Sequence, residues 1–378
     1  MSRLESFAKL KLVRAITSLR VTVVCLACLM VIVFWGTIYQ TDYGLYASQQ
    51  RFFYSWYFLA GGFIPLPGAR LVMWVFSISL LGATILKLKY RWSNIGILMT
   101  HVGVLSFFLA AFITFHSSQH SSVRLFEGGH ANVSSDYNEW ELSIWQEHSL
   151  DASTVQRDVV AVAGLKEGRS WRLSDPNCTV DVETYYDHCR ADMGPRSADA
   201  PRNAAGITRL TKQKRHTSPE EDVPGGIFRI LSPGGDPQRV LLYAAEQVPL
   251  TLEIGDETYF MALRRKRYEL PFSLKLLDFE RKVHSGTAIP KSFKSRVEVR
   301  HADATREVVI WMNHPLRYAD FTFFQSSFTP DEQGSIFAVV ENPGRWLPYI
   351  ASSTTCLGLI VHFVVMLVQS RRRQARMA

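Results

Sequence analysis

Two histidines interrupt long apolar runs near the two ends of the sequence. His101 lies ten residues after Arg91, and His362 lies nine residues before Arg371. At a rise of about 1.5 Å per helical residue, the two imidazoles would lie at nearly the same depth from these basic residues. Ionisable side chains inside a membrane are uncommon and usually functional, and neutral imidazole is a strong ligand for haem iron. We therefore predict that His101 and His362 bind haem b, with His101 as a ligand of the iron.

Small residues accompany both histidines. Gly358 stands one turn before His362 on the same helix face, which would leave room for a flat macrocycle. Gly96, Thr100 and Gly103 form a stripe that suits close packing of two helices. Two alternatives stay open. Both histidines could instead form hydrogen bonds to neighbouring helices, or the iron could take one ligand from this chain and one from a partner.

Other groups of suitable residue type carry weaker signals. His116 and His120 have the i, i+4 spacing of a metal site, with Glu127 and His130 nearby, although a polar turn at a helix end explains them more simply. The run Arg264-Arg-Lys-Arg267 could attract haem propionates, although a solvated run of charges is the simpler interpretation. Neither group alone predicts a site.

The five cysteines do not form a recognisable redox or haem-attachment motif. Cys25 and Cys28 have CxxC spacing, but they lie inside an apolar run and no histidine follows, so we interpret them as small apolar residues. Cys178 and Cys189 would face an oxidising compartment and could form a disulfide. Cys356 is interpreted as structural. The sequence also contains no nucleotide-binding, metal-hydrolase or serine-nucleophile motif in a suitable context.

Four apolar runs are long enough to hold the histidines within a membrane. A helix needs about 20 apolar residues to cross a hydrocarbon core of about 30 Å. The predicted helices cover residues 21–39, 67–86, 95–115 and 346–369. Their apolar runs, of which the second begins at Leu71, contain no acidic or basic residue. We predict four transmembrane helices, with the first acting as an uncleaved signal anchor.

Basic residues then predict the orientation. Before the first run, between the second and third, and after the fourth, the chain has twelve basic residues and one acidic residue, whereas residues 116–345 have 28 basic and 32 acidic residues. The positive-inside rule therefore puts both termini in the cytoplasm. The surplus charge of the chain, +8, is thus topogenic and does not indicate nucleic-acid binding. The twelve basic residues are Arg3, Lys9, Lys11, Arg14, Arg20, Lys87, Lys89, Arg91, Arg371, Arg372, Arg373 and Arg376.

The remaining segments are predicted outside the cytoplasm. Residues 40–70 form a short aromatic loop, which we expect to be a re-entrant or amphipathic interfacial segment that ends at the Pro- and Gly-rich residues 64–68. Residues 116–345 show alternating strand patterns separated by turns and predict a large, mostly β domain, sandwich-like or barrel-like. Within it, residues 190–226 are rich in Pro, Gly and charge and predict a flexible insertion. Residues 370–378 form a basic cytoplasmic tail.

An ordered series of short motifs runs through the second half of the chain. It reads Tyr268-Glu-Leu-Pro-Phe-Ser-Leu, Leu277-Asp-Phe, Gly286-Thr-Ala-Ile-Pro-Lys-Ser-Phe-Lys-Ser-Arg-Val, Met312-Asn-His-Pro-Leu-Arg-Tyr, Phe323-Phe-Gln-Ser-Ser-Phe and Asn342-Pro-Gly, followed by the last apolar run. This series resembles the ResB family, also called CcsB, of system II cytochrome c biogenesis. Gly36-Thr and His101-Val-Gly in the first and third runs agree with it.

The resemblance implies a membrane subunit of the cytochrome c synthase. Such a subunit works with a ResC/CcsA-type partner, and the pair moves haem across the membrane and presents it, reduced, to the CxxCH thiols of apocytochrome c. His101 matches a transmembrane haem ligand of the family, whose counter-ligand is thought to come from the partner. The tryptophan-rich haem-handling motif belongs to that partner, and here the nine tryptophans are scattered singly, so this chain should not ligate haem unaided.

The sequence also leads to expectations for one histidine of the outer domain and for the cellular location. His314, in Asn313-His314-Pro315-Leu316, is the outer-domain histidine that could contact haem, although stabilising a turn is the simpler interpretation. The resemblance implies the bacterial inner membrane, with the large domain periplasmic. Two alternatives remain: a b-type electron-transfer protein in which His101 and His362 ligate one iron, and a scaffold for assembly that binds no haem.

Overall fold

The computed structural model describes residues 11–146, 160–195, 200–287, 290–302, 304–329 and 333–377. The chain divides into two compact units. The helical unit comprises Met1–Ser118 and Asn342–Ala378, and the β unit comprises Gln119–Glu341. The β unit is thus a few residues shorter at each end than the predicted domain of residues 116–345.

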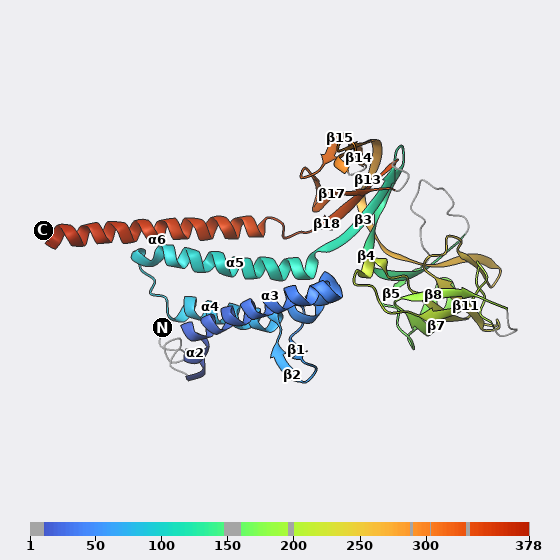
Figure 1. Ribbon diagram of the computed structural model, residues 1–378, viewed down its shortest axis with the longest axis horizontal. Coiled ribbons are helices and arrows are strands. Elements are labelled where there is room, and N and C mark those ends of the chain that lie inside the picture. The colour runs from blue at the N-terminus through green and yellow to red at the C-terminus, as the bar shows by residue number, and fades with distance from the viewer. Residues whose placement is uncertain are drawn as a thin grey trace. The chain divides into compact units, whose positions relative to one another are not determined.

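Four helices of the helical unit are long and apolar enough to cross a membrane, as the sequence predicts. They are α3 (Leu19–Ser48), α4 (Ala69–Leu86), α5 (Ile95–Ser117) and α6 (Leu347–Met377), and a short helix α2 (Lys11–Ile16) precedes them. Figure 1 shows α5 and α6 running alongside each other. The combination of four such helices with a mostly β unit confirms the predicted fold class.

The segment predicted as an interfacial loop has more regular structure than expected. Helix α3 continues to Ser48 through a kink at Gly44, whose φ of 82° is accessible to glycine at little cost, and a π-helical turn η1 (Gln49–Phe53) follows. Strands β1 (Tyr57–Ala60) and β2 (Ile64–Pro67) then pair as a hairpin. Gly68 precedes the first turn of α4, so the Pro- and Gly-rich residues end the segment without forming a helix, as predicted.

Glycines bring α5 and α6 into backbone contact. A Cβ atom added at Gly96 would lie 2.6 Å from Cα of His362, and one added at Gly103 would lie 3.0 Å from Cα of Thr355. This confirms the predicted packing stripe. Gly358, however, does not leave room for a macrocycle: a Cβ there would lie 2.6 Å from the backbone nitrogen of Thr100. That prediction is wrong because α5 itself occupies the space.

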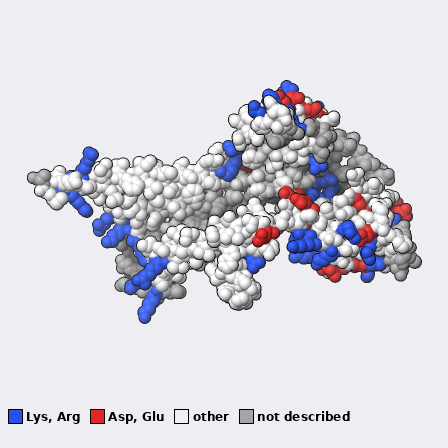
Figure 2. Space-filling model, in the orientation of Figure 1, with Lys and Arg blue, Asp and Glu red and all other residues white. Residues whose placement is uncertain are grey.

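Basic residues gather at one end of the helical unit. The ammonium of Lys87, after α4, donates to the carbonyl of Thr17 over 2.6 Å, and the hydroxyl of Ser79 donates to the carbonyl of Ile16 over 2.8 Å. The end of α4 therefore lies beside the start of α3. Figure 2 shows Lys and Arg clustered at this end of the helical unit and near the C-terminus, with a nearly uncharged surface along the helices.

Sixteen strands of the β unit are described. They are β3 (Gln119–Phe126), β4 (His130–Gln146), β5 (Val160–Ala163), β6 (Ser170–Ser174), β7 (Asn177–Tyr186), β8 (Cys189–Met193), β9 (Ile207–Lys212), β10 (Gly225–Leu231), β11 (Gln238–Tyr243), β12 (Leu250–Ile254), β13 (Glu257–Val283), β14 (Pro290–His301), β15 (Ala304–Trp311), β16 (Leu316–Tyr318), β17 (Phe321–Phe328) and β18 (Gly334–Glu341). Alternation of side chains produces these strands; in β12, for example, Leu250, Leu252 and Ile254 are buried while the residues between them are exposed.

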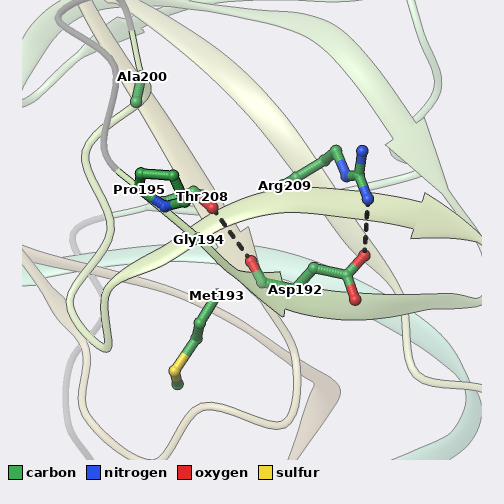
Figure 3. Close-up of a pocket in the computed structure, with 7 residues that line it drawn as sticks. All are labelled: Asp192, Met193, Gly194, Pro195, Ala200, Thr208 and Arg209. Carbon is green, nitrogen blue, oxygen red and sulfur yellow. Dashed lines mark hydrogen bonds and ion pairs between the residues drawn. The ribbon is translucent and has the colours of Figure 1, made fainter.

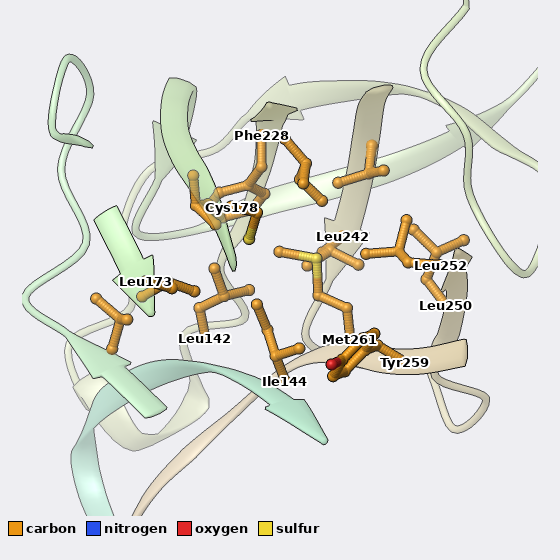
Figure 4. Close-up of a cluster of buried hydrophobic side chains, with 14 of the residues drawn as sticks. Leu142, Ile144, Leu173, Cys178, Phe228, Leu242, Leu250, Leu252, Tyr259 and Met261 are labelled. Carbon is orange, nitrogen blue, oxygen red and sulfur yellow. The ribbon is translucent and has the colours of Figure 1, made fainter. Parts of the chain in front are cut away.

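The long strands β4 and β13 contribute to two separate apolar cores. The largest sheet has the order β15-β14-β13-β4-β3-β18-β17-β16, and the four-stranded sheet has the order β11-β10-β7-β6. One core packs β6, β7, β10 and β11 against β4, β5, β12 and the first part of β13, around Phe228, Leu142 and Met261 (Figure 4). The other lies around Phe323, Phe337 and Leu274, between β3 and the strands from late β13 to β18.

The first and last strands of the β unit are neighbours. Strand β18 pairs antiparallel with β3, and in this register Gln119 stands opposite Glu341. The chain therefore enters and leaves the β unit at adjacent positions of one sheet.

The predicted flexible insertion contains regular structure in its described part. Strands β8 and β9 form a hairpin, and Ile207, Leu210 and Cys189 are buried with Leu241 of β11. Composition did not predict this regular structure, because a few apolar residues suffice for a small satellite cluster when β11 covers them. The flexibility of residues 190–226 stays a prediction.

Candidate functional site

His101 is fixed in one ring orientation by a neighbouring helix. Its Nδ1 atom lies 2.9 Å from the hydroxyl oxygen of Thr84 on α4. The Thr84 hydroxyl donates its single proton to the carbonyl of Leu80 over 2.7 Å, so toward His101 it accepts. Nδ1 of His101 must then carry the proton, which leaves a lone pair on Nε2. In metal-binding histidines, the ring nitrogen that does not bind the metal usually donates a hydrogen bond that fixes the tautomer in this way.

No other hydrogen bond occupies the imidazole of His101 within the described residues. The backbone carbonyl of Thr84 accepts a further bond, 2.8 Å, from the Tyr90 hydroxyl, so the end of α4 that carries Thr84 is itself anchored. The arrangement presents Nε2 as an available ligand atom. Thr84 was not identified from the sequence, because α4 also carries the hydroxyls of Ser77 and Ser79 and nothing local distinguishes Thr84 from them.

His362 lies on the other side of α5. Its backbone contacts Gly96, and its Nδ1 atom is buried with no hydrogen-bond partner among the described residues. A buried polar atom of this kind calls for an explanation, such as a role in binding a ligand. His101 follows Gly96 by five residues, which turns it about 140° around α5 from the side that faces α6. The structure therefore does not bring the two predicted haem ligands together.

His314 lies in a tight turn of the β unit. Its backbone nitrogen donates to the carbonyl of Trp311 over 2.9 Å, and its ring stacks on the Trp311 ring with centroids 4.1 Å apart. Nδ1 lies 3.4 Å from the carbonyl of Met312, and Asn313 between them has a positive φ of 66°. These contacts agree with the turn-stabilising alternative. The role of His314 toward haem stays a prediction.

The residues whose spacing could suit a metal do not form a metal site among the described residues. His116 ends α5 and is bonded to its own helix, while His120 stands in β3 opposite Val340. Glu127 accepts from the backbone nitrogen of Phe279, and His130 stands in β4 opposite Lys275. Across the described ranges, no three His, Cys, Asp or Glu side chains gather as a metal site.

The run from Arg264 to Arg267 is not simply solvated. Arg264 forms an ion pair with Glu141 across β13 and β4, with 3.0 Å between Nε and Oε1 and side chains 13% and 6% exposed. Burial lowers the pKa of the Arg264 guanidinium to about 10. Arg265 covers the Trp140 ring and donates to the Tyr137 and Glu220 carbonyls, and Lys266 pairs with Glu139. The solvated interpretation is therefore wrong, since these cations join the two long strands.

The two cysteines considered for a disulfide are free thiols in different places. Cys178 lies in the core around Phe228, whereas Cys189 lies in the satellite cluster with Ile207. Burial raises the pKa of each thiol to about 11. Neither thiol is therefore poised for oxidation, because the reactive form is the thiolate.

A shallow pocket of about 490 Å³ lies on the β8–β9 hairpin (Figure 3). Asp192 pairs with Arg209 at 3.7 Å, and the hydroxyl of Thr208 donates to the Asp192 carbonyl over 3.3 Å. These polar groups satisfy one another within the hairpin. The described residues that line this pocket therefore form no arrangement of groups suited to catalysis.

Comparison with known proteins supports the resemblance seen in the motifs. The model of the ResB-like family matches residues 250–339, which cover β12 and almost all of the strands that follow it in the β unit. This part of the β unit is therefore similar to the ResB-like family. The chain is also 33% identical over 114 residues to the protein NrfI of Wolinella succinogenes. That match covers 29% of this chain and 12% of NrfI, so the chain spans only a small part of this relative's length.

Proposed function

We propose that this ResB-like chain is a membrane subunit of system II cytochrome c biogenesis that holds haem b at His101. It would work with a ResC/CcsA-type partner that supplies the second axial ligand, and together they would present haem to the CxxCH thiols of apocytochrome c. The observation that carries this proposal is the hydrogen bond from Nδ1 of His101 to Thr84, which keeps Nε2 available for iron.

The proposed location is the bacterial inner membrane, with both termini cytoplasmic and the β unit periplasmic. The gathering of basic residues at one end of the helical unit supports this orientation through the positive-inside rule. An outer β unit suits a role in docking apocytochrome c, because thioether formation depends on holding thiols and haem in a fixed geometry. The chain would contribute positioning, and ligation itself would require the partner.

The electron-carrier alternative needs both transmembrane histidines on one iron. The hydrogen bond of His101 toward α4 and the contact of His362 with Gly96 argue against such a pair within this chain. His362 stays a predicted haem-binding residue, and its unsatisfied Nδ1 supports testing it.

The test is an absorption spectrum of the complex purified after co-expression with a ResC/CcsA-type partner. We expect His101→Ala to lower the Soret band by the haem that His101 binds, and His101→Gly to regain that intensity when imidazole is added. His284→Ala, an exposed histidine of the β unit, serves as the control. Equal loss with His101→Ala and His362→Ala would favour the electron carrier, and an unchanged spectrum with His101→Ala would leave the scaffold.

A further inference from the structure

An apolar cavity of about 850 Å³ lies between α3, α4, α5 and the turn η1. Its walls include Met73 and Trp74 of α4 and Phe108 of α5, and it extends from Arg70 and His116 at one end to Leu81 and Leu105 at the other. Eleven residues separate the two ends on each helix, which corresponds to about 16 Å. The cavity is within the usual size range of about 300–1,000 Å³ for small-molecule sites.

The cation at the rim of this cavity has no anionic partner. The Arg70 guanidinium lies over the rings of Trp56 and Phe115, at 4.8 Å and 5.5 Å from their centroids. Among the described residues its side chain takes part in no ion pair or hydrogen bond. An unpaired cation beside an apolar slot favours an anionic group carried by an apolar body.

The histidine at the rim has the same kind of fixed ring as His101. Nδ1 of His116 lies 2.9 Å from the carbonyl oxygen of Phe112. A carbonyl only accepts, so Nδ1 carries a proton and, in the neutral ring, the lone pair is on Nε2. The imidazole also packs on the rings of Phe112 and Phe115, at centroid distances of 4.3 Å and 5.0 Å, which holds its plane at the cavity mouth.

We propose that this cavity is a second haem site, in which Nε2 of His116 ligates the iron and Arg70 pairs with a propionate. The proposal rests on the proposed function only in taking haem as the molecule that the protein handles. Haem matches the three features of this cavity. Its planar body is apolar like the walls, its carboxylates can pair with Arg70, and its iron can bind the imidazole of His116. A phospholipid could use Arg70 and the apolar walls, but it would leave the His116 lone pair unused. Fifteen residues of α5 separate His116 from His101, about 22 Å, so the two sites would be distinct.

The experiment is a titration of the full chain, purified without haem in detergent, with haemin followed by the Soret band. We expect two equivalents for the wild type, one for His101→Ala and none for the His101→Ala, His116→Ala double variant. Arg70→Gln in the His101→Ala background should weaken binding about tenfold, because it removes a charge-assisted hydrogen bond. Arg124→Gln, at an exposed arginine of β3, and His284→Ala are the matched controls.

Imidazole distinguishes ligation from misfolding. The His101→Ala, His116→Gly double variant should regain one equivalent and its Soret position when imidazole is added. If His101→Ala alone removes all bound haem, the proposed function stands and the second site is overturned. If His101→Ala changes nothing while His116→Ala removes haem, the second site stands and the His101 proposal fails. Haem binding that responds to Arg70→Gln and to added anionic phospholipid but not to His116→Ala indicates a lipid groove and overturns the site.

Discussion

The two units use charge in opposite ways. All ion pairs among the described residues lie in the β unit, where Arg264 with Glu141 and Arg229 with Glu183 join neighbouring strands. The helical unit has none in its described part, and Arg70 contacts only aromatic rings. This contrast indicates that the helical unit is held by close backbone packing and a few hydroxyl bonds. Two of its cations, Lys87 and Arg51, donate to backbone carbonyls instead of pairing with carboxylates.

The largest effect should come from filling the glycine contact of the helical unit. In Gly358→Leu, the added side chain would overlap the backbone of Thr100, so we expect α5 and α6 to separate and the yield of monodisperse protein to fall sharply. Size-exclusion chromatography and thermal melting in detergent measure this. Ser353→Leu, on the exposed face of the same helix, is the control and should behave as wild type. A normal melt for Gly358→Leu would mean that packing at this contact does not hold the unit together.

The next effect tests charge as a stabiliser in the β unit. Glu141→Ala leaves the buried guanidinium of Arg264 without its partner, which should lower the free energy of unfolding by about 3–5 kcal/mol. Glu139→Ala breaks the more exposed pair with Lys266 on the same strands and should cost less than about 1 kcal/mol. Denaturant unfolding of the full chain, followed by tryptophan fluorescence, compares the two. Equal losses would contradict the assignment of Arg264 to the interior.

A smaller effect tests how the helical unit uses a hydroxyl. Thr84→Val keeps the shape but removes the acceptor for Nδ1 of His101, so haem affinity at His101 should fall about 10–100-fold. Thr84→Ser restores the hydroxyl and should bind as wild type. Haemin titration in the His116→Ala background isolates this site, and wild-type affinity for Thr84→Val would show that Thr84 does not orient the ligand.

The smallest effect concerns the cysteines of the β unit. Because Cys178 and Cys189 are free and lie in separate clusters, a phosphine reductant should change the free energy of unfolding by less than about 0.5 kcal/mol. Denaturant unfolding with and without the reductant is the measurement. A loss of about 2–4 kcal/mol would instead reveal a stabilising disulfide.

Local patterns predicted the elements better than their contacts. Uncharged apolar runs predict spans because each residue contributes independently, and the alternation in β12 predicts a strand for the same reason. The bond between Thr84 and His101 joins two helices, and no local pattern encodes which faces meet. Gly358 illustrates the same limit, since a gap for a cofactor and a contact for a helix both require a small residue.

Amino-acid composition gave a wrong expectation in two places where a few buried residues decide the local structure. The stretch of residues 190–226 has so few large apolar side chains that it resembles a linker, yet Ile207 and Leu210 are enough once Leu241 covers them. In the charge run, the position of Arg264 in a buried strand depends on β4 lying beside it. The rim of the cavity combines Arg70 and His116, which are 46 positions apart in the sequence, so only the packing of α4 and α5 relates them.

The pairing of β3 with β18 has a consequence for how this protein can vary. Since Gln119 and Glu341 are neighbours in one sheet, the two ends of the β unit lie side by side. In the order of the chain, this unit is an insertion between α5 and α6. The entropy of joining the two helices is then set by a short spacing rather than by more than 200 intervening residues. Such an insertion can lengthen, shrink or be exchanged as a module while the helical unit keeps the same connection.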